Sequence, residues 1–165
     1  MEHIKGAKKV NLSYCNNVTD IGLKYLKCVQ TINLSMCNKI IDAGIKYLKT
    51  AYNIDISWNN ITNNGLKYLA VVNTINLQGC KKITDDGLEY LKQCQIINLS
   101  FCEQITDKGL KYLNGVREIN IAQCNNITDV GLEYLKSAHT INLCHCEQIT
   151  DNGIKHLVGE LKFQV

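Results

Sequence analysis

The sequence predicts an α/β solenoid, curved and right-handed, in which about seven repeats each supply one strand of a parallel sheet and one short helix. Three observations predict this fold class: an apolar anchor recurs about every 22 residues, the apolar spacing changes within each repeat, and a glycine stands at one fixed place in every copy. A period of this length is typical of stacked strand-and-helix repeats.

One column of isoleucine or valine sets the period of the repeat. When each repeat is counted so that this anchor is position 4, successive anchors are 22 residues apart, except for one step of 21. The anchors are Val10, Ile32, Ile54, Ile75, Ile97, Ile119 and Ile141. Adding 22 once more predicts an eighth strand with Phe163 and Val165 in its inward positions.

Apolar spacing inside each repeat changes from two residues to three, which marks the passage from strand to helix. In the second repeat, Ile32 and Leu34 alternate as in a strand, and Ile45 and Leu48 follow helical spacing. A Thr-Asp pair such as Thr106-Asp107 precedes most helical parts, where its side-chain oxygen can accept a free backbone N–H.

A glycine follows two residues after the start of each helical part. Because glycine lowers helix stability, its recurrence predicts close packing between stacked helices. These glycines are Gly22, Gly44, Gly65, Gly87, Gly109, Gly131 and Gly153.

The two kinds of element stack at different spacings. Strands stack about 4.8 Å apart, whereas packed helices lie roughly 8–10 Å apart, so the helical side must spread. This places the sheet on the concave face and the helices on the convex face. One repeat buries too few aliphatic side chains to fold alone, and no linker is visible, so residues 1–165 are expected to form a single domain.

Nine cysteines are present, and six of them occupy position 9 of the repeat. A column that recurs once per repeat favours a small buried side chain, so we expect reduced thiols and an intracellular location, cytoplasmic or nuclear. The six are Cys15, Cys37, Cys80, Cys102, Cys124 and Cys146. Cys28 and Cys94, at or next to position 1, are also expected in the core.

The string LxxCxxITDxGLxYL resembles the cysteine-containing leucine-rich repeat family, as in the repeat domains of F-box adaptor proteins and related viral or amoebal proteins. The resemblance covers Val10 to Val165. It implies binding rather than chemistry, and a structural cysteine that bonds into the next loop. The third repeat is one residue shorter and has Asn59 in the cysteine position, where one hydrogen-bond donor replaces another.

Composition and motifs argue against several classes of function. A formal charge of +3 without a block of like charge gives no strong case for nucleic acid, and no apolar run is long enough to cross a bilayer. No histidine stands near a recurring acid and nucleophile, so no catalytic residue and no cofactor are expected. Cys144-His145-Cys146 contains metal-binding residue types, but alternate strand residues point to opposite faces, so no metal is expected.

Recognition can be encoded only in columns that vary. Position 8 varies most, and large apolar residues there fit the anchors of a protein interface, flanked by variable residues at position 2. The predicted partner-binding residues are Tyr14, Met36, Trp58, Phe101 and His145 at position 8, with Tyr52, Arg117 and His139 at position 2. The alternative that the position-8 side chains fold over the loops as a hydrophobic lid stays open.

Three further columns are interpreted as structural. Asparagines at position 5, such as Asn33 and Asn98, are expected to form an amide ladder along the inner face. Tyrosines at position 19 are expected to pack on the convex side. Lysines at position 18 are interrupted by Glu89 and Glu133 and indicate a solvated face.

These observations predict a non-enzymatic module that binds a protein partner through its inner face and rim. The resemblance implies an adaptor or substrate-recognition element of the ubiquitin-ligase type. Two alternatives remain open: a structural repeat protein that self-assembles through its exposed terminal strands, and a weak nucleic-acid binder that uses its lysines.

Overall fold

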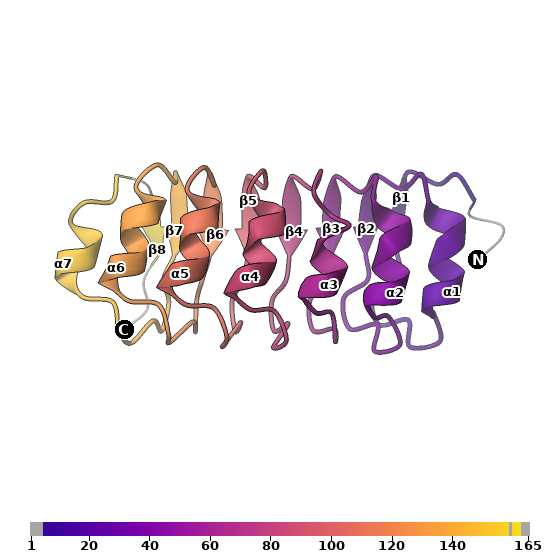
Figure 1. The fold of residues 1–165 in the computed structure, drawn as a ribbon, viewed down its shortest axis with the longest axis horizontal. Coiled ribbons are helices and arrows are strands. Elements are labelled where there is room, and N and C mark those ends of the chain that lie inside the picture. The colour runs from indigo at the N-terminus through magenta and orange to yellow at the C-terminus, as the bar shows by residue number, and fades with distance from the viewer. Residues whose placement is uncertain (1–4, 159, 163–165) are drawn as a thin grey trace.

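The computed structural model describes residues 5–158 and 160–162. Its eight strands form one parallel sheet in which each strand pairs with the next along the chain. The helices lie in a row on one side of this sheet (Figure 1). The strands are β1 (Lys9–Asn11), β2 (Thr31–Asn33), β3 (Asn53–Asp55), β4 (Thr74–Asn76), β5 (Ile96–Asn98), β6 (Glu118–Asn120), β7 (Thr140–Asn142) and β8 (Glu160–Lys162).

Each helix is a single α turn of four residues, extended in five repeats by a 3₁₀ turn. The helices are α1 (Asp20–Leu23), α2 (Asp42–Ile45), α3 (Asn63–Leu66), α4 (Asp85–Leu88), α5 (Asp107–Leu110), α6 (Asp129–Leu132) and α7 (Asp151–Ile154). The 3₁₀ turns are η2 (Lys24–Leu26), η3 (Lys46–Leu48), η4 (Glu89–Leu91), η5 (Lys111–Leu113) and η6 (Glu133–Leu135). None of the helices in the described ranges is long and apolar enough to cross a membrane.

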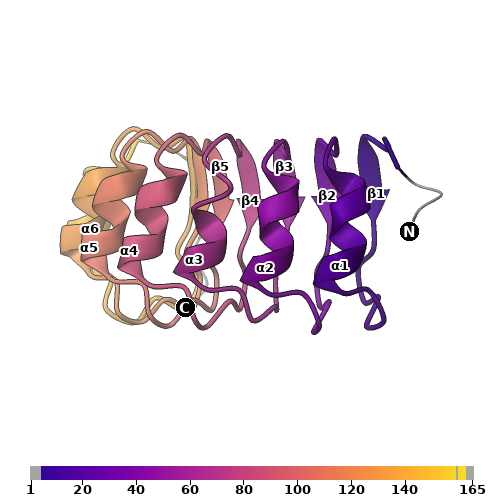
Figure 2. The same ribbon diagram turned by 45° about the vertical axis from the view of Figure 1, so that its right-hand side comes forward.

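The row of repeats bends. In Figure 2, α1 to α4 remain side by side, whereas α5 and α6 overlap in the view, as expected for an arc rather than a straight stack. The predicted fold class, a curved solenoid with its parallel sheet on the concave face and short helices on the convex face, is confirmed.

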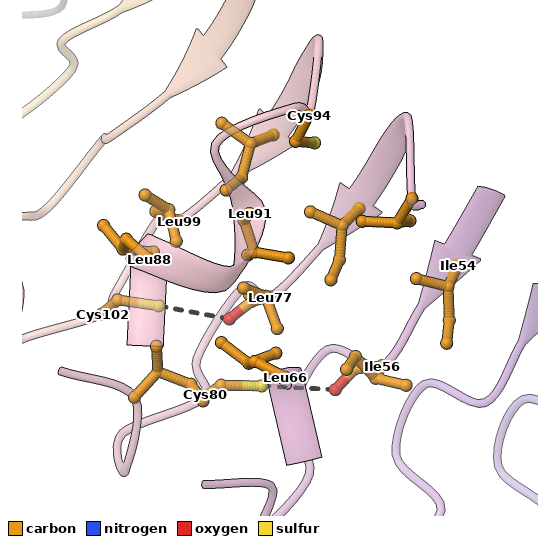
Figure 3. Packing of buried hydrophobic residues seen from close by; sticks show 14 of the residues in the cluster. Ile54, Ile56, Leu66, Leu77, Cys80, Leu88, Leu91, Cys94, Leu99 and Cys102 are labelled. Atoms are coloured by element: carbon orange, nitrogen blue, oxygen red, sulfur yellow. Dashed lines mark hydrogen bonds between the residues drawn. The ribbon is translucent and has the colours of Figure 1, made fainter. Parts of the chain in front are cut away.

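The anchor column forms the inner side of the core because the strands pair in exact register. Ile32 pairs with Ile54, and Ile54 with Ile75. Each anchor points between sheet and helices, where it meets the leucines of the helical part. Figure 3 shows this packing from Ile54 to Leu99, with Leu66 and Leu88 contributed by α3 and α4. No repeat closes its own core, so each one is completed by its neighbours.

The position-9 thiols connect consecutive repeats. Cys80 Sγ donates a hydrogen bond to the Ile56 carbonyl at 3.3 Å, and Cys102 Sγ donates to the Leu77 carbonyl at 3.2 Å (Figure 3). The resemblance implied a bond into the next loop, but the bond runs back to the strand end of the preceding repeat. The Leu77 carbonyl also accepts the backbone N–H of Cys80, so the thiol of Cys102 satisfies its second lone pair.

Asn59 takes the place of cysteine in the third repeat and performs the same task. Its Nδ2 donates to the Leu34 carbonyl of the preceding repeat at 2.8 Å, and to the carbonyls of Ile56 and Ser57. The predicted replacement of one donor by another is therefore confirmed. Asn59 Oδ1 is buried and has no hydrogen-bond partner within the described part of the chain.

The aspartate that begins each helix also bonds to the next repeat. Asp85 accepts the backbone N–H and the hydroxyl of Thr106, at 2.8 and 2.6 Å. Thr106 in turn caps its own helix by accepting the Lys108 N–H, as predicted for the Thr-Asp pair. The same arrangement links Asp129 to Thr150, whose hydroxyl and backbone N–H lower the pKa of the Asp129 carboxyl. The recurring glycine leaves room for this aspartate.

Two further expectations from the sequence are wrong. In the eighth strand Leu161, not Phe163, pairs with Ile141. The reason is the length of the last repeat: the segment from the helix glycine to the strand anchor (Gly153 to Leu161) is two residues shorter than in the repeat before. Phe163 and Val165 themselves lie outside the described residues. Cys28 is exposed, because it lies one residue before the buried position 1, whereas Cys94 at that position is buried.

We expect Gly109→Ala to lower the free energy of unfolding by about 1–2 kcal/mol, because overpacking outweighs the gain in helix propensity. An added Cβ would overlap the Asp85 carboxylate and lie 3.2 Å from the Cα of that residue. Gly115→Ala is the matched control, because a Cβ there meets no atom within 4 Å. Urea unfolding of both variants measures the difference, and equal stabilities would contradict the packing account.

We expect iodoacetamide at pH 8 to label Cys28 in the folded protein and to leave Cys80 and Cys124 unlabelled until urea unfolds it. Burial raises the pKa of the Cys80 thiol to about 11 and that of Cys124 to about 12, so both remain protonated and shielded. Mass spectrometry after short exposure locates the label. Labelling of Cys80 in the folded protein at the rate of Cys28 would show that the position-9 thiols are not buried.

Candidate functional site

A groove runs along the concave face of the sheet, from β1 to β7. Its volume is about 780 Å³, and its floor consists of strand residues. Positions 3 and 5 of each strand line this floor, because both alternate with the buried anchor at position 4. The position-5 column was recognised from the sequence, but position 3 was missed although strand alternation identifies it. The position-3 residues are Lys9, Thr31, Asn53, Thr74, Ile96, Glu118 and Thr140.

The position-5 asparagines hold the turn that follows each strand. Asn33 Oδ1 accepts the Ser35 N–H at 2.8 Å, and Asn98 Oδ1 accepts both the N–H and the hydroxyl of Ser100. The structural role predicted for this column is therefore correct. Of the predicted ladder, the bond from Asn76 Nδ2 to Asp55 Oδ2 forms, at 3.1 Å, but no amide-to-amide bond forms in the described residues. Consequently the Nδ2 groups of Asn33 and Asn98 have no protein acceptor there and remain available to a bound molecule.

Position 8 adopts the left-handed backbone conformation in all seven copies. The φ angles are 61° at Tyr14, 56° at Met36, 58° at Trp58, 67° at Gly79, 61° at Phe101, 63° at Gln123 and 57° at His145. Position-8 N–H groups bond to the next repeat, as when Trp58 donates to the Gln78 carbonyl at 2.8 Å. This conformation costs a non-glycine residue roughly 1–2 kcal/mol, yet only one copy is glycine.

Trp58 and Phe101 form an aromatic pair across three repeats. Their ring centroids are 5.8 Å apart with an angle of 42° between the rings. Gly79 lies between them, and the Trp58 ring occupies the space that a Cβ at Gly79 would fill. Trp58 thus covers part of a loop, as the lid alternative requires, but Trp58 and Phe101 each remain 38% exposed. Tyr14 and His145 are also exposed, and Met36 is partly buried.

The eight predicted site residues do not form one continuous rim. Tyr52, Arg117 and His139 are exposed, but each immediately precedes its strand, whereas position 8 follows it. The two sets therefore lie at opposite edges of the groove, with the strand between them. Their common role in binding stays a prediction, and a partner that reaches both must cross the groove floor.

The remaining candidate groups have structural partners. Cys146 Sγ donates to the Ile121 carbonyl at 3.1 Å, and neighbouring His145 is exposed. Within the described ranges, no three His, Cys, Asp or Glu residues converge as a metal site would require. On the convex face, Lys46 lies over the Tyr47 ring, 5.0 Å from its centroid. Tyr47 packs against the core, which fits the structural role predicted for this column.

Sequence comparison identifies a family. The family model for leucine-rich repeats matches residues 8–27, 54–70, 72–92, 95–113 and 116–136, which together exceed half of the chain. A comparison with curated protein sequences gave no significant match.

Several solved structures share the fold. The Toll–Spätzle complex of Drosophila contains a chain that matches with a TM-score of 0.68 and 13% identity, over 87% of this chain and 20% of that one. Internalin C2 of Listeria monocytogenes matches with a TM-score of 0.68 and 23% identity, over 93% of this chain and 80% of that one. Internalin F of the same organism gives 0.60 and 22%, over 87% and 52%. At these identities the likeness concerns the fold alone.

Because position 8 is strained, we expect Gln123→Gly to raise the free energy of unfolding by about 0.5–1 kcal/mol. Relief of the left-handed strain exceeds the entropy that glycine gains in the unfolded chain. The Gln123 side chain makes no hydrogen bond within the described ranges, so little contact is lost. Gln123→Ala removes the same side chain without relieving strain, and urea unfolding should show no gain for it. Equal effects of the two substitutions would refute the strain at position 8.

Proposed function

Because the chain belongs to the leucine-rich repeat family, we propose that it is a non-enzymatic interaction module that binds a protein partner in its concave groove. The observation that carries the proposal is the exposed Trp58–Phe101 pair in the loops that follow β3 and β5, two of the strands that form the groove floor. Aromatic side chains supply large contact area at little conformational cost and are enriched among the residues that dominate binding energy.

The backbone at position 8 supports this proposal. Six copies keep a side chain where glycine would relieve strain. Strain retained in a folded protein often accompanies function. Contact with Phe101 offsets part of the backbone strain at Trp58. Tyr14 and His145 are exposed, so packing against the protein does not explain why these positions keep a side chain. A role in recognition accounts for the whole column.

The groove supplies polar groups for orientation as well as apolar anchors. Free amide donors such as those of Asn33 and Asn98 lie along its floor, and its volume of about 780 Å³ extends over seven strands. An extended segment of a partner protein fits this shape, because its carbonyls can accept from the amide row while its side chains reach the edges. A structural neighbour, Toll, is itself known in a complex with Spätzle, which supports protein recognition by this fold.

The biological setting that we propose is that of an adaptor or substrate-recognition element of the ubiquitin-ligase type, within the cell. The support for the adaptor role is the resemblance of the cysteine-type repeat to the repeat domains of F-box proteins. The support for the intracellular location is that thiols such as those of Cys80 and Cys102 serve as hydrogen-bond donors, which requires their reduced state.

We expect Trp58→Ala with Phe101→Ala to abolish capture of a partner from cell lysate, because the two rings contact each other and form one exposed aromatic surface. The matched control is Tyr90→Ala with Tyr134→Ala, which removes two aromatics of similar exposure, 42% and 40%, from the convex face. Circular dichroism must show that both variants are folded. A partner that the wild type and the control retain and the Trp58 variant loses is the expected result. Loss from the control alone would place the site on the convex face.

A further inference from the structure

We propose that the groove selects a partner segment with a basic side chain, arginine in particular, which pairs with Asp55 beside Trp58. This inference rests on the proposed function and adds the chemistry of the partner. Asp55 is the one acidic residue in the position-5 column: the other six repeats have asparagine there, and Lys162 of β8 pairs with Asn142 at the far end. The column tolerates a neutral amide in those six repeats, so the carboxylate is not required by the turn that it holds.

Asp55 accepts hydrogen bonds but has no ion-pair partner among the described residues. Its Oδ1 accepts the N–H and the hydroxyl of Ser57, at 3.0 and 2.6 Å, and its Oδ2 accepts from Asn76 Nδ2 at 3.1 Å. In the described ranges, no basic nitrogen lies within 4.0 Å of either oxygen. A carboxylate accepts about four hydrogen bonds, so one acceptor site on Oδ2 remains.

No charged side chain neighbours Asp55 on the described part of the groove floor. Its neighbours on the groove floor are Thr31, Asn33, Asn53, Thr74 and Asn76, none of them charged. The nearest charged floor residues are Lys9, two strands away, and Glu118, three strands away; with the offset of two residues along the strand, these backbone separations are about 12 Å and about 16 Å. At such separations salt screens the interaction strongly. A partly buried, unpaired charge is costly, and a cationic partner offsets that cost.

The same repeat supplies an aromatic surface for such a cation. Trp58 follows Ser57, the residue that holds the Asp55 carboxylate, and its ring extends over Gly79 to Phe101. A guanidinium can stack on an indole face while one of its N–H groups donates to the remaining site on Oδ2, whereas a point-like ammonium lacks the planar surface for stacking. Asp55 on the floor and Trp58 at the edge thus present complementary contacts for one arginine side chain.

The test is selection from a phage-displayed library of random twelve-residue peptides on the full chain. Three proteins are compared: wild type, Asp55→Asn, and Asp55→Asn with Asn98→Asp. The single variant restores the residue found in the rest of the column, so the fold should persist. The double variant moves the carboxylate to Asn98, which bonds Ser100 as Asp55 bonds Ser57. We expect wild type to enrich arginine at one peptide position and Asp55→Asn to lose that enrichment.

The affinity of the tightest wild-type peptide, measured by calorimetry, then isolates the pair. Replacing its enriched arginine by citrulline should weaken binding to wild type about tenfold and binding to Asp55→Asn less than twofold. The double variant should not recover the affinity for this peptide, because the carboxylate no longer lies beside Trp58. If citrulline weakens binding equally in wild type and Asp55→Asn, or if both proteins enrich arginine, the charge preference is overturned. The proposal that the groove binds a peptide is unaffected by either result. Failure of all three proteins to select any peptide would overturn groove binding itself, and this inference with it.

Discussion

Stacking of each repeat on the one before it is the interaction on which the whole structure depends. A single copy has one three-residue strand and one helical turn, and its aliphatic side chains have no core until the neighbouring copies supply it. Directional bonds accompany this packing: the thiol of Cys102 reaches the carbonyl of Leu77, and the carboxylate of Asp85 reaches Thr106. These bonds fix the register between repeats, which apolar contact alone does not.

The same register shapes the functional face. Because the strands align exactly, floor residues at the same repeat position form straight columns, and successive residues within a column are about 4.8 Å apart. The loops after the strands also align: position 8 takes a left-handed conformation, and N–H groups at this position, such as that of Trp58, bond to the next loop. Repetition therefore supplies a rigid groove, and departures from repetition, such as Asp55 and Trp58, give that groove its chemical character.

Much of the fold could be predicted from the sequence, because the core columns follow from periodicity alone. Ile54 and Leu66 are buried where the pattern places them, and Asn59 donates as the cysteine does in other copies. The register of β8 was predicted wrongly because the 22-residue period was applied to the last repeat, in which the segment from helix to strand is two residues shorter. Amide bonding at Asn33 was also predicted wrongly, because the partner of a short polar side chain depends on the turn that follows it.

The candidate site could be predicted only in part. Variation along position 8 identified Trp58 and Phe101, but not their contact across Gly79, which depends on how a side chain leans in a left-handed turn. Tyr52 was grouped with Trp58 because both columns vary, although a strand separates them. Asp55 escaped notice because aspartate resembles asparagine in size and bonding, and its lack of a counter-charge becomes visible only when its neighbours are known.

Trp58 is the chain's one tryptophan, so its fluorescence tests most directly whether a partner binds in the groove beside it. A peptide selected on the wild-type protein is titrated in while emission and quenching by acrylamide are recorded, with binding followed independently by calorimetry. We predict a blue shift and weaker quenching that saturate together with the heat of binding, because the peptide covers a ring that is 38% exposed in the free protein. Unchanged emission and unchanged quenching in the saturated complex would contradict the account and place binding elsewhere.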